Sequence, residues 1–207
     1  MPRRDEDSHD ILGTFKVLSN RAEMMKTPTS PKELFAILSH RHSILLEGRP
    51  HMNPGIFKTK NNRAGMTEFV DYQLVKGTLS QGFKYYAALT DPFARAIFMM
   101  FMISEVHPFN DGNGRIARVM MNAELVRADQ SRIIVPTVFR EDYILALRKL
   151  TRHKDPLAYI NVMTKLHQFS DNLYGTDFTE LKNYLAACNA YEEPSQAKLQ
   201  IIDRSIL

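Results

Sequence analysis

Apolar residues fill two neighbouring stretches in the middle of the chain, and each stretch predicts a helix. Residues 93–106 are apolar on almost every side of a helix, and a helix of that kind belongs in the centre of a domain. Asp91 and Pro92 precede it as an N-cap and a first helical residue. Residues 114–128 place apolar side chains at helical spacing on one side only, so they predict an amphipathic partner helix. With the loop between them, these helices form a helix-loop-helix over residues 92–128.

The rest of the chain repeats the helical period between clear breakers. Proline, glycine and Asp-Pro pairs divide it into further expected helices, at about 10–26, 30–48, 72–89, 140–151, 155–169, 177–190 and 194–203. One pair of extended runs, at 57–62 and 67–70, instead predicts a β-hairpin with Asn-Arg-Ala-Gly as its turn. Because there are no repeats or long linkers, we expect residues 1–207 to form a single domain, with a helical annex or contact surface at 171–207.

Composition excludes several classes of protein. Acidic and basic residues are interspersed, and the net charge of +4 is too small to indicate a nucleic-acid-binding protein. The single cysteine, Cys188, excludes an internal disulfide. The apolar run at 93–106 is shorter than the roughly 20 residues needed to cross a bilayer, and the charged first residues show no signal peptide. We therefore expect a cytoplasmic protein that has neither nucleic acid nor a membrane as a partner.

The loop between the central helices leads into a glycine-rich helix start, which is typical of an anion site. The first N–H groups of a helix have no partner within it, and the helix dipole adds partial positive charge there. Gly112 and Gly114 leave these N–H groups accessible, and Arg115 can offer a bidentate guanidinium to phosphate. Arg118 follows one turn later on the same side of the helix. These residues predict a phosphate-binding site.

The same loop carries a base and a metal ligand. His107 has a side chain that titrates near neutral pH, so it can accept a proton from an attacking hydroxyl. Asp111 offers the hard oxygen ligand that Mg²⁺ prefers. Taken singly, these are a helix cap, a turn residue and an ordinary Gly-Asn-Gly turn. Together and in this order they favour a site that transfers part of a nucleotide.

The segment from His107 to Arg118 reads HPFNDGNGRIAR, which matches the Fic-family signature HxFx[D/E]GNGRxxR without departure. The resemblance implies an all-α helical bundle of about eight helices with one β-hairpin flap beside the active site. It also implies a Mg²⁺-dependent reaction in which AMP passes from ATP to a Ser, Thr or Tyr hydroxyl of a protein. By resemblance, His107 is the catalytic base, Asp111 holds Mg²⁺, and the nucleotide-binding residues are Gly112, Asn113, Gly114, Arg115 and Arg118. Phe109 is expected to anchor the loop in the core.

Residues Ser43 to Gly48 resemble the inhibitory pattern of the same family, [S/T]xxxE[G/N]. Ser43 and Glu47 are four residues apart, so they are expected to project from one side of an inhibitory helix over 30–48. Gly48 would end this helix and leave Glu47 in its last turn. By resemblance, Glu47 pairs with Arg118 and holds ATP misaligned for attack. Replacing Glu47 with glycine is therefore predicted to increase AMP transfer strongly.

The expected hairpin at 56–71 resembles the family's flap. By resemblance, Phe57, Lys58 and Thr59 belong to an edge that pairs with the main chain of a target protein, which is a case of strand addition. The alternative is a plain connector with solvated charges. The resemblance leaves open whether the target includes a copy of the chain itself, and whether the chain forms a homo-oligomer as many relatives do.

Three alternatives to AMP transfer stay open on the sequence. The site could move another nucleotide or a phosphate-linked group. In some inhibited relatives the glutamate corresponding to Glu47 instead helps water to remove AMP from a modified protein. A non-catalytic nucleotide sensor is the third alternative, and His107 argues against it because phosphate binding needs no base.

Overall fold

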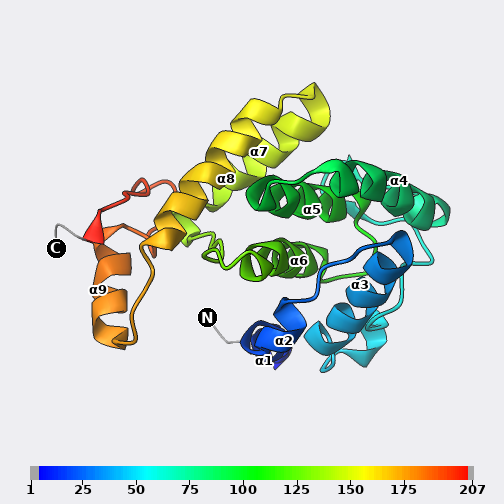
Figure 1. Ribbon diagram of the computed structural model, residues 1–207, viewed down its shortest axis with the longest axis horizontal. Coiled ribbons are helices and arrows are strands. Elements are labelled where there is room, and N and C mark those ends of the chain that lie inside the picture. The colour runs from blue at the N-terminus through cyan, green and yellow to red at the C-terminus, as the bar shows by residue number, and fades with distance from the viewer. Residues whose placement is uncertain (1–4, 205–207) are drawn as a thin grey trace. The chain divides into compact units, whose positions relative to one another are not determined.

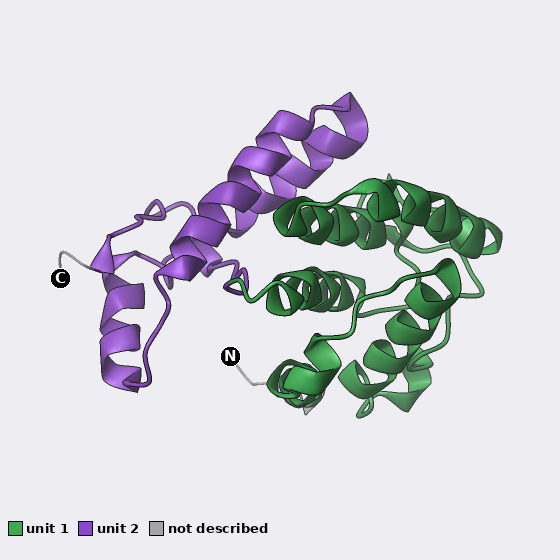
Figure 2. Ribbon diagram, viewed as in Figure 1, with its two compact units in different colours: residues 1–130 green, residues 131–207 purple. Residues whose placement is uncertain are grey.

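The chain folds into helices with one small hairpin, as predicted. The computed structural model describes residues 5–204, and its contacts divide the chain into two compact units, residues 1–130 and 131–207 (Figure 2). The first unit contains α1 (Asp5–Ser19), α2 (Arg21–Met24), α3 (Pro31–Leu45), η1 (Pro50–Met52), β1 (Arg63–Ala64), β2 (Thr67–Glu68), η2 (Tyr72–Leu74), α4 (Val75–Ala88), α5 (Pro92–Val106) and α6 (Asn113–Arg127) (Figure 1). The second contains η3 (Thr137–Phe139), α7 (Arg140–His153), α8 (Pro156–Asp171) and α9 (Phe178–Ala187).

The all-α fold class is confirmed for residues 5–204, which contain nine α-helices where about eight were expected. The boundary between the two units falls at residue 130, ahead of the annex expected at 171–207. A single domain over the whole chain therefore stays a prediction. Within the described part of the chain, no helix combines the length and the apolar character that a membrane span requires.

The two central helices form the middle of the first unit. Asp91 caps α5 by accepting a hydrogen bond from the N–H of Ala94 at 2.7 Å, and Pro92 is the first helical residue. α6 is buried along most of its length, not on one face as predicted, and even the Glu124 carboxylate is inside, where it accepts from the Tyr86 hydroxyl at 2.6 Å. The reason is that α6 lies against α5 and also contacts α1, α2 and α3 (Figure 1).

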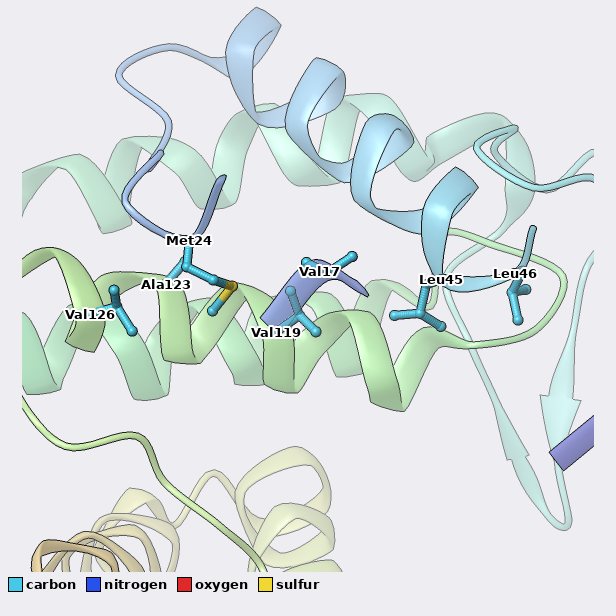
Figure 3. Packing of buried hydrophobic residues seen from close by; sticks show 7 residues of the cluster. All are labelled: Val17, Met24, Leu45, Leu46, Val119, Ala123 and Val126. Carbon is cyan, nitrogen blue, oxygen red and sulfur yellow. The ribbon is translucent and has the colours of Figure 1, made fainter. Parts of the chain in front are cut away.

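An apolar cluster holds the N-terminal helices against α6. It combines residues of α1, α2 and α6 with the C-terminal end of α3: Val17, Met24, Leu45, Leu46, Val119, Ala123 and Val126 (Figure 3). Gly13 allows α1 to approach closely, because a Cβ at this position would lie only 2.4 Å from the carbonyl oxygen of Leu45. The packing therefore places α1 directly on the end of α3.

The β-hairpin is present with a different register from the predicted one. β1 pairs antiparallel with β2, so the turn is formed by residues 65–66 and not by 62–65. Residues 57–62 are not a strand. Their main chain has another partner, since the N–H of Lys58 donates to the carbonyl oxygen of Pro108 at 2.8 Å.

Two predicted helices also differ from the structure. The helix expected at 10–26 is interrupted by Asn20, whose side chain caps α2. The helix expected at 194–203 is wrong, because this segment bonds to the end of α9 and not to itself. The N–H of Gln200 donates to the carbonyl oxygen of Cys188 at 3.1 Å, and the Tyr184 hydroxyl donates to that of Ile202 at 2.7 Å.

Candidate functional site

The predicted base, His107, lies at the C-terminal end of α5. The helix ends at Val106, and His107 takes the left-handed conformation with a φ of 50°. Its Nδ1 lies 3.0 Å from the carbonyl oxygen of Ser104. A carbonyl oxygen can only accept, so Nδ1 carries the proton and Nε2 carries the lone pair. The Ser104 carbonyl is available because Pro108, which would follow in a longer helix, has no N–H to donate to it.

The surroundings of His107 keep its imidazole neutral. Burial lowers its pKa, and the Lys58 ammonium lowers it further. The hydrogen bond to Ser104 and the charge of Asp111 act in the opposite direction, and the net pKa lies below the ordinary value. The ring of Phe69 covers one face of the imidazole, with 3.5 Å between the ring centroids and 6° between the planes. His107 therefore has the protonation state that a general base needs at neutral pH.

Phe109 anchors the loop, as predicted, and His42 from α3 stacks on it. Phe109 is fully buried, and its ring centroid lies 3.7 Å from that of His42 with the planes 4° apart. Nδ1 of His42 accepts from the N–H of Gly55 at 2.8 Å, so Nε2 donates to the main-chain carbonyl oxygen of Asp111 at 2.9 Å. This role of His42 could not be predicted from the sequence, because a histidine inside a helix carries no local signal for contact with a distant loop.

The hydrogen bonds of His42 to Gly55 and Asp111 predict that the fold loses stability in mild acid. Burial lowers the pKa of His42, so the folded state holds it neutral while the unfolded chain binds a proton below about pH 6.5. The stabilisation is therefore complete above pH 6.5 and decreases as the pH falls. Urea unfolding at pH 7.5 and 5.5 should show this loss, and His42→Gln should reduce the difference between the two pH values. His153→Gln on the exposed end of α7 is the control; an equal effect of both variants would contradict the prediction.

The loop after Asp111 leads through Gly112 into the start of α6, and the phosphate-binding role of this helix start stays a prediction. Gly112 caps α6 with a φ of 75°, a conformation that side-chain-bearing residues rarely adopt. Gly114 is exposed beside Arg118, whose Nη1 would lie 3.6 Å from a Cβ at residue 114. Asn113 is buried, and its amide bonds both the N–H and the carbonyl oxygen of Phe109, at 2.9 and 2.8 Å. The Asn113 side chain therefore shapes the loop, and a nucleotide contact from this residue would come from its main-chain N–H.

Asp10 and Arg49, which carry no sequence signal for the site, form a charge network with Asp111 and Arg115. Arg49 Nη1 lies 2.6 Å from Asp111 Oδ2 and 3.1 Å from Asp10 Oδ2. The guanidinium of Arg115 pairs with the same Asp10 oxygen, and its Nη2 lies 3.5 Å from Asp111 Oδ2. The Asp10 and Arg49 side chains are only 12% and 9% exposed. The carboxylate of Asp10 thus pairs with Arg115, which is predicted to bind phosphate.

Asp111 is a suitable ligand for the predicted Mg²⁺. Burial raises its pKa, but the Gly112 N–H and the guanidiniums of Arg115 and Arg49 outweigh this effect and hold the pKa below its ordinary value. The ionised side chain is 40% exposed, so a cation can reach it. Among the side chains that the structure describes, those of residues 8–204, there is no cluster of three or more His, Cys, Asp or Glu that could hold a metal ion. A single carboxylate is sufficient for Mg²⁺ when the phosphates of a nucleotide supply further ligands.

Glu47 does not take the predicted position. α3 ends at Leu45, so Glu47 lies beyond the helix and not in its last turn. Its carboxylate is 64% exposed and binds Lys16 of α1 at 2.5 Å, where the sequence predicted a pair with Arg118. Lys16 is also what lowers the pKa of Glu47, first through this hydrogen bond and then through its charge. The prediction failed here because it took no account of α1, which packs on the end of α3.

The two other residues of the expected inhibitory pattern contact their own surroundings. The Ser43 hydroxyl donates to the carbonyl oxygen of His40 at 2.7 Å, within α3. Gly48 follows the helix and lies against α1, because a Cβ there would be 2.6 Å from Cγ of His9. The inhibitory role of Ser43, Glu47 and Gly48 stays a prediction.

The three residues expected to dock a target lie ahead of β1. Phe57 is half-buried, with its ring centroid 5.2 Å from that of Phe109. Lys58 is only 3% exposed, and Thr59 is exposed. Thr59 is therefore the most accessible of the three, and their role in target docking stays a prediction.

Comparisons with known proteins find similarity to one family. A family model described as the Fic/DOC family matches residues 30–125. A protein adenylyltransferase of Caenorhabditis elegans, fic-1, is 39% identical over 110 residues, which is 53% of this chain and 22% of that protein. A Fido domain-containing protein of Dictyostelium discoideum is 27% identical over 49% of this chain and 75% of its own length. This chain thus spans about a fifth of the length of the first of these relatives.

Solved structures share the fold at low sequence identity. A fragment of C. elegans fic-1 superposes with a TM-score of 0.67 and 19% identity, and the match covers 91% of this chain and 54% of that one. A Fic domain-containing signalling protein of Bacteroides thetaiotaomicron also reaches 0.67, with 16% identity over 81% of this chain and 70% of its own. A structure described as IbpAFic2 covalently tethered to Cdc42 reaches 0.50, with 15% identity over 80% of this chain and 63% of that one.

Proposed function

Because this chain belongs to the Fic/DOC family, we propose that it is a protein adenylyltransferase, which transfers AMP from ATP to a hydroxyl group of a protein. The observation that carries this proposal is the state of His107. Its Nδ1 proton is bonded to the Ser104 carbonyl, so Nε2 is an unprotonated base in the loop that leads into α6. A base beside an anion-binding helix start suits transfer of a phosphate-linked group, whereas binding alone needs no base.

The proposed reaction is a single displacement at the α-phosphorus of ATP. The oxygen of a Ser, Thr or Tyr hydroxyl bonds to this phosphorus, the bond from phosphorus to the oxygen bridging the β-phosphate breaks, and diphosphate leaves. Nε2 of His107 takes the hydroxyl proton. The first N–H groups of α6, with Arg115 and Arg118, would stabilise the charge on the phosphates. Asp111 would hold Mg²⁺, which neutralises phosphate charge when it is bound.

Mass spectrometry with a panel of labelled donors tests this function. The protein is incubated with Mg²⁺ and ATP, GTP, CTP, UTP or a nucleoside-diphosphate alcohol, alone and in a cell lysate. We expect an AMP adduct from ATP on a hydroxyl of a target or of the chain itself. An adduct from another donor would favour transfer of a different group. ATP binding without any adduct would favour the nucleotide sensor. Release of AMP from an AMP-modified protein added to the reaction would instead assign hydrolytic removal of AMP.

We also propose that the N-terminal helices restrain the site in the absence of nucleotide. Arg115 is paired with Asp10, and the carboxylate of Asp111 is paired with Arg49. Both partners must be displaced before these two groups can meet phosphate and Mg²⁺. The restraint therefore comes from Asp10 of α1 and from Arg49, the residue after the expected inhibitory pattern. It adds to any effect of Glu47 on the site.

A comparison of Glu47→Gly with Lys16→Met separates two roles for Glu47. Both variants remove the same exposed ion pair, and the loss of such a pair is expected to change the rate only slightly. Only Glu47→Gly also removes the carboxylate that the family pattern places at the nucleotide. We expect Glu47→Gly to increase AMP transfer more than Lys16→Met does, as measured by incorporation of labelled AMP. Equal rates in the two variants would show that Glu47 acts only through α1.

A further inference from the structure

The segment ahead of the hairpin donates hydrogen bonds to the turn that carries His107. The main-chain N–H of Lys58 donates to the carbonyl oxygen of Pro108 at 2.8 Å, and its Nζ donates to that of Val106 at 3.3 Å. Nδ2 of Asn62 donates to the carbonyl oxygen of Phe109 at 2.9 Å and lies 3.4 Å from that of His107. Four consecutive carbonyl groups of the turn thus have partners in two flap residues.

These bonds stabilise a conformation that the turn would not hold alone. The last carbonyl groups of a helix have no partners within it, and a residue other than glycine is strained in the left-handed region unless its surroundings hold it there. His107 is in this region, with a φ of 50°. Lys58 is 3% exposed and is held by Asn62, whose Oδ1 accepts from Nζ at 2.7 Å. The flap therefore fixes the main chain on which the base is carried.

The other arm of the flap holds the imidazole ring. Phe69 directly follows β2 and joins the hairpin through the bond from its N–H to the carbonyl oxygen of Asn62 at 3.3 Å. Its ring lies parallel to that of His107 at 3.5 Å. Without Phe69, the hydrogen bond from Nδ1 to the Ser104 carbonyl oxygen would leave the imidazole of His107 able to tilt about that bond. A parallel ring on one face restricts this movement and keeps Nε2 in one direction.

We propose that Phe69 and Lys58 are positioning residues for His107, so that the flap orients the base as well as docking a target. This inference rests on the proposed function, in which His107 is the base. Phe69 restricts the direction of the imidazole. Lys58 bonds the last carbonyl of α5, at the negative end of the helix dipole, which would otherwise favour a protonated imidazole. The charged groups that act on His107 are Lys58 and Asp111, and Asp71 acts in turn on Lys58.

The test combines ¹⁵N NMR of the histidine rings with steady-state kinetics. The variants are Phe69→Leu, which removes the stacked ring, Phe69→Tyr, which retains it, and Lys58→Met, which removes the charge from a chain of similar length. The NMR spectrum reports the tautomer and the pKa of His107 without any substrate, and His107→Gln assigns its signals. Circular dichroism confirms that each variant is folded. If Lys58→Met does not fold, Lys58→Gln, which retains a hydrogen-bond donor, takes its place.

We expect Phe69→Leu to mix the two tautomers of His107 and to lower kcat by about 10- to 100-fold, with the KM for ATP unchanged and with Phe69→Tyr close to the wild type. Lys58→Met should raise the pKa of His107 and move the acid limb of the kcat profile to higher pH by the same amount. Wild-type spectra in folded Phe69→Leu and Lys58→Met variants would overturn the proposal, whatever the rates. If the spectra change as expected but the wild type transfers no AMP, the positioning stands and the proposed function fails.

Discussion

Replacing His107 with alanine should lower the rate of AMP transfer by about 10²- to 10⁴-fold. The structure leaves Nε2 as the unprotonated nitrogen, and removing it leaves the target hydroxyl without a proton acceptor. ATP affinity should change little, because the phosphate-binding groups lie in the loop from Gly112 and on α6. Incorporation of labelled AMP into a target or into the chain itself measures the rate, and calorimetry measures ATP binding.

The control for this variant is His153→Ala, on the exposed end of α7, which should transfer AMP at the wild-type rate. Equal rates with and without the His107 imidazole would exclude a base at this position and with it the proposed mechanism. A loss of ATP binding that matches the loss of rate would instead show that His107 acts by holding the loop in shape.

Replacing Asp10 with asparagine should tighten ATP binding by about tenfold. Asp10 pairs with Arg115 and Arg49 in a setting where both carboxylate and guanidinium are largely shielded from water. A hydrogen bond between charged groups contributes about 1.5–3 kcal/mol, and each 1.4 kcal/mol changes an affinity by about tenfold. Asparagine keeps the size of the side chain and loses the charge, so the phosphates of ATP no longer compete with an ionised carboxylate.

Calorimetric titration with ATP, with and without Mg²⁺, measures this effect. The matched control is Asp129→Asn, which removes the carboxylate of an exposed pair with Arg21 in the same unit and should leave the affinity unchanged. Asp10→Asn is also expected to lower the melting temperature, since Arg49 and Arg115 lose a shared counter-charge. An unchanged affinity in a folded Asp10→Asn variant would show that Asp10 stabilises the fold without restraining the nucleotide site.

The elements that could be predicted from the sequence are those with local signals. Asp91 and Pro92 begin α5 with the predicted cap hydrogen bond, and Ser30 caps α3 in the same way. Such bonds join residues two or three positions apart, so the signal lies within a short stretch of chain. The position of His107 at the end of a buried helix followed from the same reasoning.

The elements that could not be predicted depend on partners far along the chain. Lys58 bonds to the turn after α5, and residues 57–62 form no strand, so the hairpin turn moves to 65–66. Residues 194–203 bond to the end of α9 and not to one another. Periodicity reports which residues are apolar, but it cannot show where a main-chain group finds its partner.

The sequence by itself determined the helix-loop-helix and its chemistry, because a base, a carboxylate, glycines and arginines lie within twelve consecutive residues there. Only the tertiary structure decided what surrounds that chemistry. Asp10 reaches Arg115 from α1, and Phe69 reaches His107 from the hairpin. Neither residue carries a local signature of its role, because each acts through a desolvated contact that exists only when segments distant in sequence pack together.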